Sequence, residues 1–221
     1  ARTNRIQGNE TTHGFETGIK SLLLNRTLTT TLLGFVYTNS NISRRNPLLD
    51  DPIADANQTQ PQLVAAGEER FSGGSLNLRY AHGQNWIFTC LATYTHAITT
   101  ASPDLPEEVG RQLSRLPSRT AVVGARYVFK KGSLKGLSSG LTGTYVGSYV
   151  FSYEDRNRLY LKYPDYLLLN ANVGYSWTQP KKKMSHSVGM SLRNLLDRDM
   201  IATLARPGQQ RALSVSYSST F

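Results

Sequence analysis

Apolar and polar residues alternate along most of the chain, and helical periodicity is nearly absent. In residues 166–177, for example, Leu167, Leu169 and Tyr175 occupy one parity, whereas Asn170 and Asn172 occupy the other. Such alternation is typical of β-strands with one apolar and one polar face. It predicts nine strands, at residues 14–24, 28–39, 72–81, 86–96, 120–129, 140–151, 166–177, 185–195 and 211–221. Residues 1–7 are expected to be the end of a tenth strand.

The connections between the predicted strands alternate between long and short. The long ones are residues 40–71, 99–119, 152–165 and 196–210, and the short ones are residues 25–27, 82–85, 130–136 and 178–184. In an antiparallel up-and-down meander, this alternation places every long loop at one end of the sheet. Bacterial outer-membrane barrels have this arrangement, with long extracellular loops and short periplasmic turns.

The amino-acid composition bears on whether the chain could cross a membrane with helices or with strands. Charged residues make up 18% of the chain, below the usual value of about 25%, and hydrophobic residues make up 39%. No segment approaches the ~18 consecutive apolar residues of a membrane-spanning helix. A membrane protein with this sequence must therefore be a closed barrel, because only helices and closed barrels satisfy their backbone groups in lipid.

The formal net charge of +10 is compatible with a nucleic-acid-binding face or with a surface near anionic lipid headgroups. The basic residues are scattered apart from the lysines at 181–183, so we expect no nucleic-acid partner. Cys90 is the only cysteine, which excludes an internal disulfide. The N-terminal residues contain no apolar signal region, so we expect a mature or truncated segment.

Four stretches of the sequence resemble the motifs of one known protein family. Residues 193–199, RNLLDRD, are similar to the family's N-L-F-D-K-x-Y stretch, with Leu196 in place of Phe. Gly208 and Arg211 lead into a last strand that ends in Phe221, similar to the family's G-x-x-R lead. Residues 164–175 resemble a P-S-Y-T-L strand, and residues 13–18 resemble an R-G-x-E-x-E strand start that departs at Thr17 and Gly18. Together the four stretches resemble the C-terminal barrel half of a TonB-dependent receptor.

The resemblance implies an all-β fold: an antiparallel up-and-down meander that supplies the C-terminal nine or ten strands of a large transmembrane β-barrel. Residues 1–221 would form a single domain without the family's N-terminal plug. The implied function is import of a ferric siderophore or similar iron complex across the bacterial outer membrane. The implied partners are outer-membrane lipid and lipopolysaccharide, the TonB energy-coupling complex through the missing N-terminal part, and the barrel-assembly machinery. Tyr217 and Phe221 would belong to the signal that this machinery reads.

Candidate binding residues come from the long connections. Aromatic rings and guanidinium groups suit a rigid anionic chelate. The sequence offers one aromatic and basic cluster at Tyr149, Phe151, Tyr153, Arg156, Arg158 and Tyr160, and a second basic pair at Arg44 and Arg45. Polar residues opposite the apolar face are predicted to line the barrel interior: Glu16, Lys20, Arg79, Arg126, Asn170, Asn172 and Arg193.

Catalytic and metal chemistry find little support. Residues 136–140 match the G-x-S-x-G pattern of a nucleophile elbow, but that elbow requires a strand before it and a helix after it. Here a basic turn precedes the motif and a strand follows, which favours a glycine-rich turn. The four histidines lack ligand spacing, and adjacent carboxylates in an extended chain point apart. We therefore expect no enzyme activity, no cofactor and no metal site.

Two other classes remain open on the sequence. A passive or structural barrel, such as a porin or adhesin, shares the strand pattern and predicts further strands upstream with no plug. A soluble all-β binding module predicts that the apolar faces pack against each other in a dry core. The direction of the apolar faces thus separates the soluble module from the two barrel classes.

Overall fold

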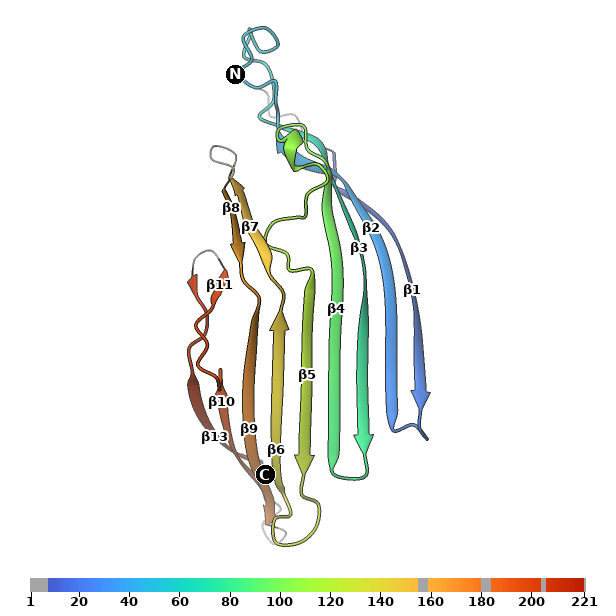
Figure 1. Ribbon diagram of the computed structural model, residues 1–221, viewed down its shortest axis with the longest axis vertical. Coiled ribbons are helices and arrows are strands. Elements are labelled where there is room, and N and C mark those ends of the chain that lie inside the picture. Colours follow the sequence, from blue (N-terminus) through green and yellow to red (C-terminus); the bar gives the residue numbers. More distant parts are fainter. Residues whose placement is uncertain (1–7, 155–158, 180–183, 204–205, 221) are drawn as a thin grey trace.

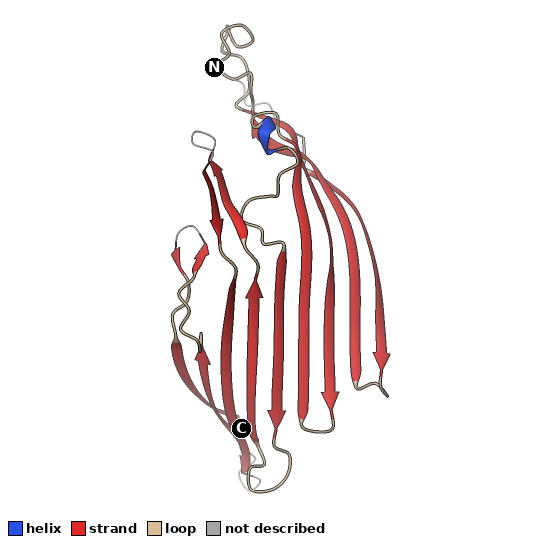
Figure 2. Cartoon of the chain, viewed as in Figure 1, coloured by secondary structure: helices blue, strands red, loops and turns tan. Residues whose placement is uncertain are grey.

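The computed structural model describes residues 8–154, 159–179, 184–203 and 206–220, with the backbone alone described at residues 151–154, 159–161, 201–203 and 206–207. Strands dominate this part of the chain, and Figure 2 shows one short 3₁₀ helix among them. That helix, η1, spans Pro106–Glu108. No helix in the described residues is long and apolar enough to cross a membrane.

Nine strands form one curved antiparallel sheet (Figure 1). Each strand pairs with the next strand of the sheet along the chain, as expected for an up-and-down meander. β1 and β13 form the two edges of this sheet. In order the strands are β1 (Thr11–Leu23), β2 (Leu28–Arg45), β3 (Leu63–His82), β4 (Trp86–Ala101), β5 (Arg119–Val128), β6 (Leu137–Val146), β9 (Tyr166–Gln179), β10 (Met184–Arg193) and β13 (Ala212–Thr220).

The strand register places the apolar positions of all nine strands on one face. Residues directly opposite each other in an antiparallel pair share a face, so each pairing extends that face to the next strand. One such row crosses the first seven strands of the sheet through Ile19, Leu32, Leu76, Ala92, Ala121, Tyr145 and Leu167. A second row joins the last three strands through Val173, Met190 and Val215.

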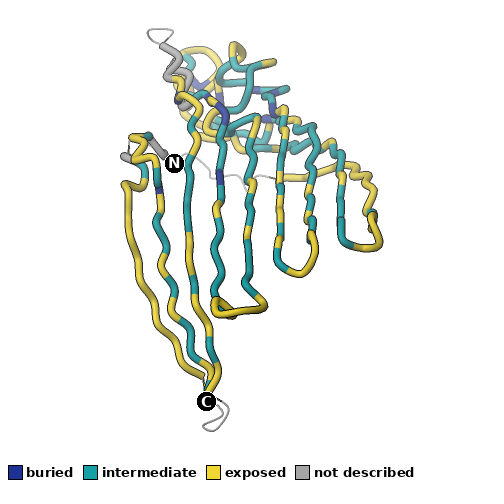
Figure 3. Tube along the Cα trace, turned by 60° about the horizontal axis from the view of Figure 1, so that its bottom comes forward, coloured by how far each residue is buried: buried dark blue, intermediate teal, exposed yellow. Residues whose placement is uncertain are grey.

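This apolar face is exposed. Phe15 is 70% exposed, Val123 is 51% exposed and Val215 is 68% exposed. Most of the residues described as buried lie instead near the long connections, as dark segments in Figure 3 show. They include Ala97, Tyr149 and Tyr163 and the polar residues Asn46, Asp55, Thr99, Ser102 and Asn194, whereas Gly143 is buried within β6. The apolar rows therefore do not pack in a dry core between two sheets, as a soluble all-β module would require.

The nine strands predicted from the sequence all exist, but several predicted boundaries are wrong, and one of these errors assigns residues to the wrong sheet. The strand expected at residues 140–151 ends at Val146 in β6, and Tyr149 begins a separate strand, β7 (Tyr149–Glu154). Within the described residues β7 pairs with β8 (Leu159–Tyr163) alone, in a hairpin outside the main sheet. The tenth strand expected at residues 1–7 lies outside the described residues.

The long connections hold more structure than the sequence predicts. β2 and β3 extend into the connection expected at residues 40–71, and a second small hairpin joins β11 (Ile201–Thr203) to β12 (Arg206–Pro207). The hairpin of β11 and β12 forms where the chain has left the main sheet and its backbone groups must find new partners, whereas the extension lengthens β2 and β3 within that sheet. Alternation of apolar and polar residues predicts the strands of the main sheet because that sheet has one apolar and one polar face. The small hairpins in the loops have no such pair of faces, so alternation does not predict them.

The short turns lie at one end of the sheet and the long connections lie at the other. In Figure 1 the short turns are at the lower end and the long connections at the upper end. The four-residue turn between β1 and β2 is sharply bent, and Leu24, Asn25 and Arg26 all have positive φ. The Thr27 hydroxyl and amide both donate to the Leu24 carbonyl oxygen, at 2.6 and 3.1 Å. The sheet thus has one compact end and one elaborate end.

Candidate ligand-binding loops and polar face

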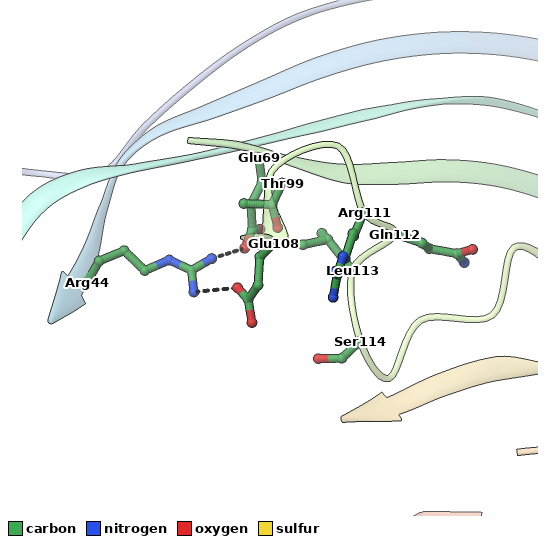
Figure 4. Close-up of a pocket in the computed structure, with 8 residues that line it drawn as sticks. All are labelled: Arg44, Glu69, Thr99, Glu108, Arg111, Gln112, Leu113 and Ser114. Atoms are coloured by element: carbon green, nitrogen blue, oxygen red, sulfur yellow. Dashed lines mark hydrogen bonds and ion pairs between the residues drawn. The ribbon is translucent and has the colours of Figure 1, made fainter. Parts of the chain in front are cut away.

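A polar cluster lies where β2, β3 and the connection between β4 and β5 meet. Arg44 reaches from the end of β2 toward two carboxylates, as Figure 4 shows. Its Nη2 lies 3.4 Å from Glu69 Oε1, and its Nη1 lies 3.6 Å from Glu108 Oε2. Glu69 belongs to β3 and Glu108 to η1, so one guanidinium joins three segments.

Backbone irregularities position Arg44. The pairing of β2 with β3 shifts at Ser40, Ile42 and Ser43, and Asn41 has φ +62°. A β-bulge of this kind re-aims the side chains that follow it. Gly67 leaves room for the arginine stem, because a Cβ there would lie 2.7 Å from Arg44 Cγ. The cluster therefore depends on a bulge and a glycine as well as on its charges.

Burial changes the acid–base behaviour of the cluster. Desolvation raises the pKa of the Glu108 carboxyl above its usual value, and the nearby Arg44 charge only partly opposes this effect. The Nε of Arg44 is buried and has no hydrogen-bond partner among the described residues. The ion pairs are thus formed in a half-buried setting, where charges affect one another more than they do in bulk water.

A cavity of about 280 Å³ adjoins this cluster. It is lined by Arg44, Glu69, Thr99, Glu108, Arg111, Gln112, Leu113 and Ser114. The lining combines guanidinium donors with carboxylate and hydroxyl acceptors, so it can bind a polar group of either sign. An anionic ligand would compete with Glu69 and Glu108 for Arg44. Its neighbour Arg45, the other half of the predicted basic pair, is exposed.

The aromatic cluster predicted at residues 149–160 falls on the hairpin of β7 and β8. Tyr149 is buried and its ring lies 5.1 Å from that of Tyr163. Burial raises the pKa of the Tyr149 hydroxyl. The backbone of Tyr153 pairs with that of Tyr160 in the hairpin, which also contains Phe151. Arg156 and Arg158 lie outside the described residues.

The seven residues predicted to line an interior share the polar face of the main sheet. The pairings place Glu16, Lys20, Arg79, Arg126, Asn170, Asn172 and Arg193 opposite the apolar rows. Arg126 lies 3.5 Å from the Ser138 hydroxyl, and the Tyr37 hydroxyl donates to Glu16. A hollow of about 340 Å³ lies along this face, with Arg126, Asn172 and several serines of β9, β10 and β13 in its lining.

Two polar networks that the sequence did not single out as sites organise the long connections. The Asp55 carboxylate is buried and accepts from the backbone N–H groups of Asp50 and Gln60, at 3.0 and 2.9 Å. Asn194, also buried, donates to the carbonyl oxygens of Arg198 and Gln209 and accepts from the Arg198 N–H. Sequence signals exist for both, in the turn-forming run around Asp51 and Pro52 and in the RNLLDRD stretch.

Two motifs identified by resemblance meet in space. Asp197 of the RNLLDRD stretch lies 2.7 Å from Arg211, the arginine that follows Gly208. Asn194 and this ion pair together tie the start of the connection between β10 and β13 to its end. Tyr217 takes the apolar face, where its hydroxyl lies 2.9 Å from His186 Nδ1, and Phe221 lies outside the described residues.

The remaining sequence motifs are structural. Gly136 forms a turn with φ +94°, and β6 follows it directly, so the G-x-S-x-G pattern lacks the helix that a nucleophile elbow requires. Glu68 bonds with Ser40 and Thr100 while Glu69 bonds with Arg44, so these adjacent carboxylates point to different partners. No group of three metal-binding side chains occurs in the described residues.

Solved structures with this fold belong to receptors and transporters. The ferric-catecholate import receptor Fiu of E. coli K12 matches 99% of this chain with a TM-score of 0.71 and 18% identity. The ferric preacinetobactin receptor BauA of Acinetobacter baumannii matches 94% with a TM-score of 0.74 and 20% identity. The copper transporter OprC matches 95% with a TM-score of 0.61 and 16% identity. No curated relative matches the sequence.

The chain covers 30%, 29% and 31% of the length of these three structures. At such identities the likeness shows the fold alone. These neighbours are receptors and transporters rather than enzymes, which agrees with the absence of catalytic activity expected from the sequence. The family model described as TonB dependent receptor-like, beta-barrel, matches residues 1–195. Because this match spans most of the sequence, the chain belongs to the TonB-dependent receptor β-barrel family.

Proposed function

We propose that residues 1–221 form the C-terminal part of the wall of an outer-membrane transporter that imports a ferric siderophore or a similar iron complex. The observation that carries the proposal is the exposed apolar face that runs unbroken across nine strands. Water disfavours such a face, whereas the hydrocarbon of a membrane stabilises it. Family membership and the iron-complex receptors among the structural neighbours support the same function.

In this proposal the polar face borders a hydrated interior and the long connections contact the ligand first. The charged groups of the polar face stay away from lipid, where a charge at mid-depth costs roughly 2–4 kcal/mol. Arg44, Arg45 and the hairpin of β7 and β8 supply guanidinium and aromatic groups for an anionic chelate. No bond of the cargo is broken. Coupling to the TonB complex belongs to parts of the transporter outside this chain.

The test uses the full-length gene in its own host. Deletion is expected to abolish uptake of one class of ⁵⁵Fe-labelled siderophore under iron limitation, and a strain without TonB is expected to show the same loss. Uptake that persists without TonB would instead indicate a passive barrel. Because the fold is shared with a copper transporter, ⁶⁴Cu uptake is measured in parallel. Loss of copper uptake alone would reject the iron assignment.

A further inference from the structure

The short turns carry a strongly one-sided charge. Between strands of the main sheet they contain seven basic residues and no aspartate or glutamate: Arg26, Lys130, Lys131, Lys135 and the three lysines at 181–183. The lysines at 181–183 lie outside the described residues and enter only through the sequence. The short-turn end therefore presents positive charge that no acidic residue of these turns compensates.

A pocket lies between two of these turns. Its volume is about 320 Å³, and it is lined by Gln84, Asn85, Tyr127, Phe129, Lys130 and Lys131. The two segments are held together, because Val128 N–H donates to the Asn85 carbonyl oxygen at 2.9 Å and Asn85 Nδ2 donates to the Val128 carbonyl oxygen at 2.6 Å. The pocket thus has a fixed backbone frame, amide side chains and two exposed ammonium groups.

Aromatic rings connect this pocket to the apolar face. The Tyr127 ring lies 4.6 Å from that of Phe129 and 4.8 Å from that of Trp86, in edge-to-face arrangements. Trp86 stacks on Phe88 at 5.4 Å. Trp86 and Tyr127 are directly opposite each other on the apolar face, and Trp86 is 40% exposed. Tryptophan and tyrosine favour the boundary between hydrocarbon and headgroups.

We propose that this pocket binds the phosphate-bearing headgroup of an anionic phospholipid, with the acyl chains lying along Trp86, Tyr127 and Phe88. The inference rests on the proposed membrane function. Lys130 and Lys131 supply the charge, and the Gln84 amide supplies a further donor. Charge complementarity alone would also fit a nucleic acid, but the adjoining exposed rings belong to a face that continues as the apolar wall, which fits a lipid.

The test is native mass spectrometry of the full-length protein titrated with phosphatidylglycerol or phosphatidylcholine of identical acyl chains. The variant Lys130→Gln with Lys131→Gln is expected to lose about ten-fold in apparent affinity for phosphatidylglycerol, with phosphatidylcholine binding unchanged. The arginine variant Lys130→Arg with Lys131→Arg is expected to retain binding. The matched control, Lys162→Gln with Arg198→Gln, removes two exposed charges at the opposite end and is expected to have no effect.

Two results would overturn the inference. One is an equal loss of phosphatidylglycerol affinity in the control variant, which would show that the loss depends on the net charge of the protein and not on this pocket. The other is full competition by glycerophosphoglycerol without acyl chains, which would indicate a soluble phosphate ester instead of a lipid. Membrane integration is scored separately by resistance to carbonate extraction. A protein released by carbonate overturns the proposed function and the lipid site together, whereas an integrated protein without lipid selectivity overturns the lipid site alone.

Discussion

The four long connections of the main sheet carry eleven acidic and eight basic residues, whereas the short turns carry seven basic residues and no acidic residue. The long-connection end also contains most of the residues described as buried. There the chain leaves the sheet, and its backbone groups need new partners, which Asp55 and Asn194 provide. The described short turns join their strands in three to eight residues, none of which is buried.

This difference shows how one sheet can serve two environments. Mixed charges and buried polar networks can hold loops in fixed shapes while leaving groups of both signs for a ligand. A uniformly basic end with aromatic rings beside it is suited to an anionic boundary. Between the two ends lies the apolar face, which is continuous because the strand register pairs apolar positions with apolar positions. The predictions below test the wall and then each end.

The largest effect is expected for a charge on the apolar face between the two ends. Val123→Lys should destabilise the full-length protein in phospholipid vesicles by roughly 2–4 kcal/mol, because the ammonium would meet hydrocarbon. The matched variant Val122→Lys places the same charge on the polar face. Its expected effect is under about 1 kcal/mol. Urea-induced unfolding measures both, and equal effects would contradict the assignment of the faces.

The short-turn end can be tested with two glycines of one turn. Gly136 has φ +94°, and a Cβ there would lie 2.1 Å from the Ser176 carbonyl oxygen. Gly132 has φ +75° but open space around it. Gly136→Ala should therefore destabilise the protein by about 3 kcal/mol and Gly132→Ala by only about 1 kcal/mol. Thermal unfolding midpoints rank the two variants, and a reversed order would refute the close approach of this turn to β9.

At the long-connection end, Asn194→Ala should cost about 2 kcal/mol of local stability. The substitution leaves the Arg198 and Gln209 carbonyl oxygens and the Arg198 N–H without their partner. Limited proteolysis should then cut the connection between β10 and β13 faster, while the short turns stay protected. Asp197→Asn, which weakens the exposed pair with Arg211, should have a smaller effect, under about 1 kcal/mol.

The smallest expected effect is a pH dependence of the Arg44 cluster. Because the pKa of Glu108 is raised in the folded protein, the folded form binds a proton more readily than the unfolded form. The docking of η1 should therefore be strongest below the usual glutamate pKa and should weaken as the pH rises through the raised value. Hydrogen exchange of residues 105–113 measures this, and Glu108→Gln should weaken the dependence, leaving the part due to Glu69, whose carboxyl pKa is also raised by desolvation.

The positions of the nine strands and the two faces could be predicted from the sequence. Period-two alternation is a local signal, and an apolar face is the same face whichever strand lies beside it. For this reason the seven polar residues from Glu16 to Arg193 could be assigned to one face before their partners were known. The motifs of the family could also be located, although their physical roles could not.

Only the tertiary structure determined what happens where the chain leaves the sheet. Arg44 meets Glu69 and Glu108 because a bulge re-aims one strand and a loop returns over it, and neither event leaves a periodic trace. The same holds for Tyr149 moving to a hairpin, for Asp197 meeting Arg211, and for the pocket between the turns at Gln84 and Lys130. Alternation specifies a face for each residue, whereas contacts between distant segments depend on how the backbone bends.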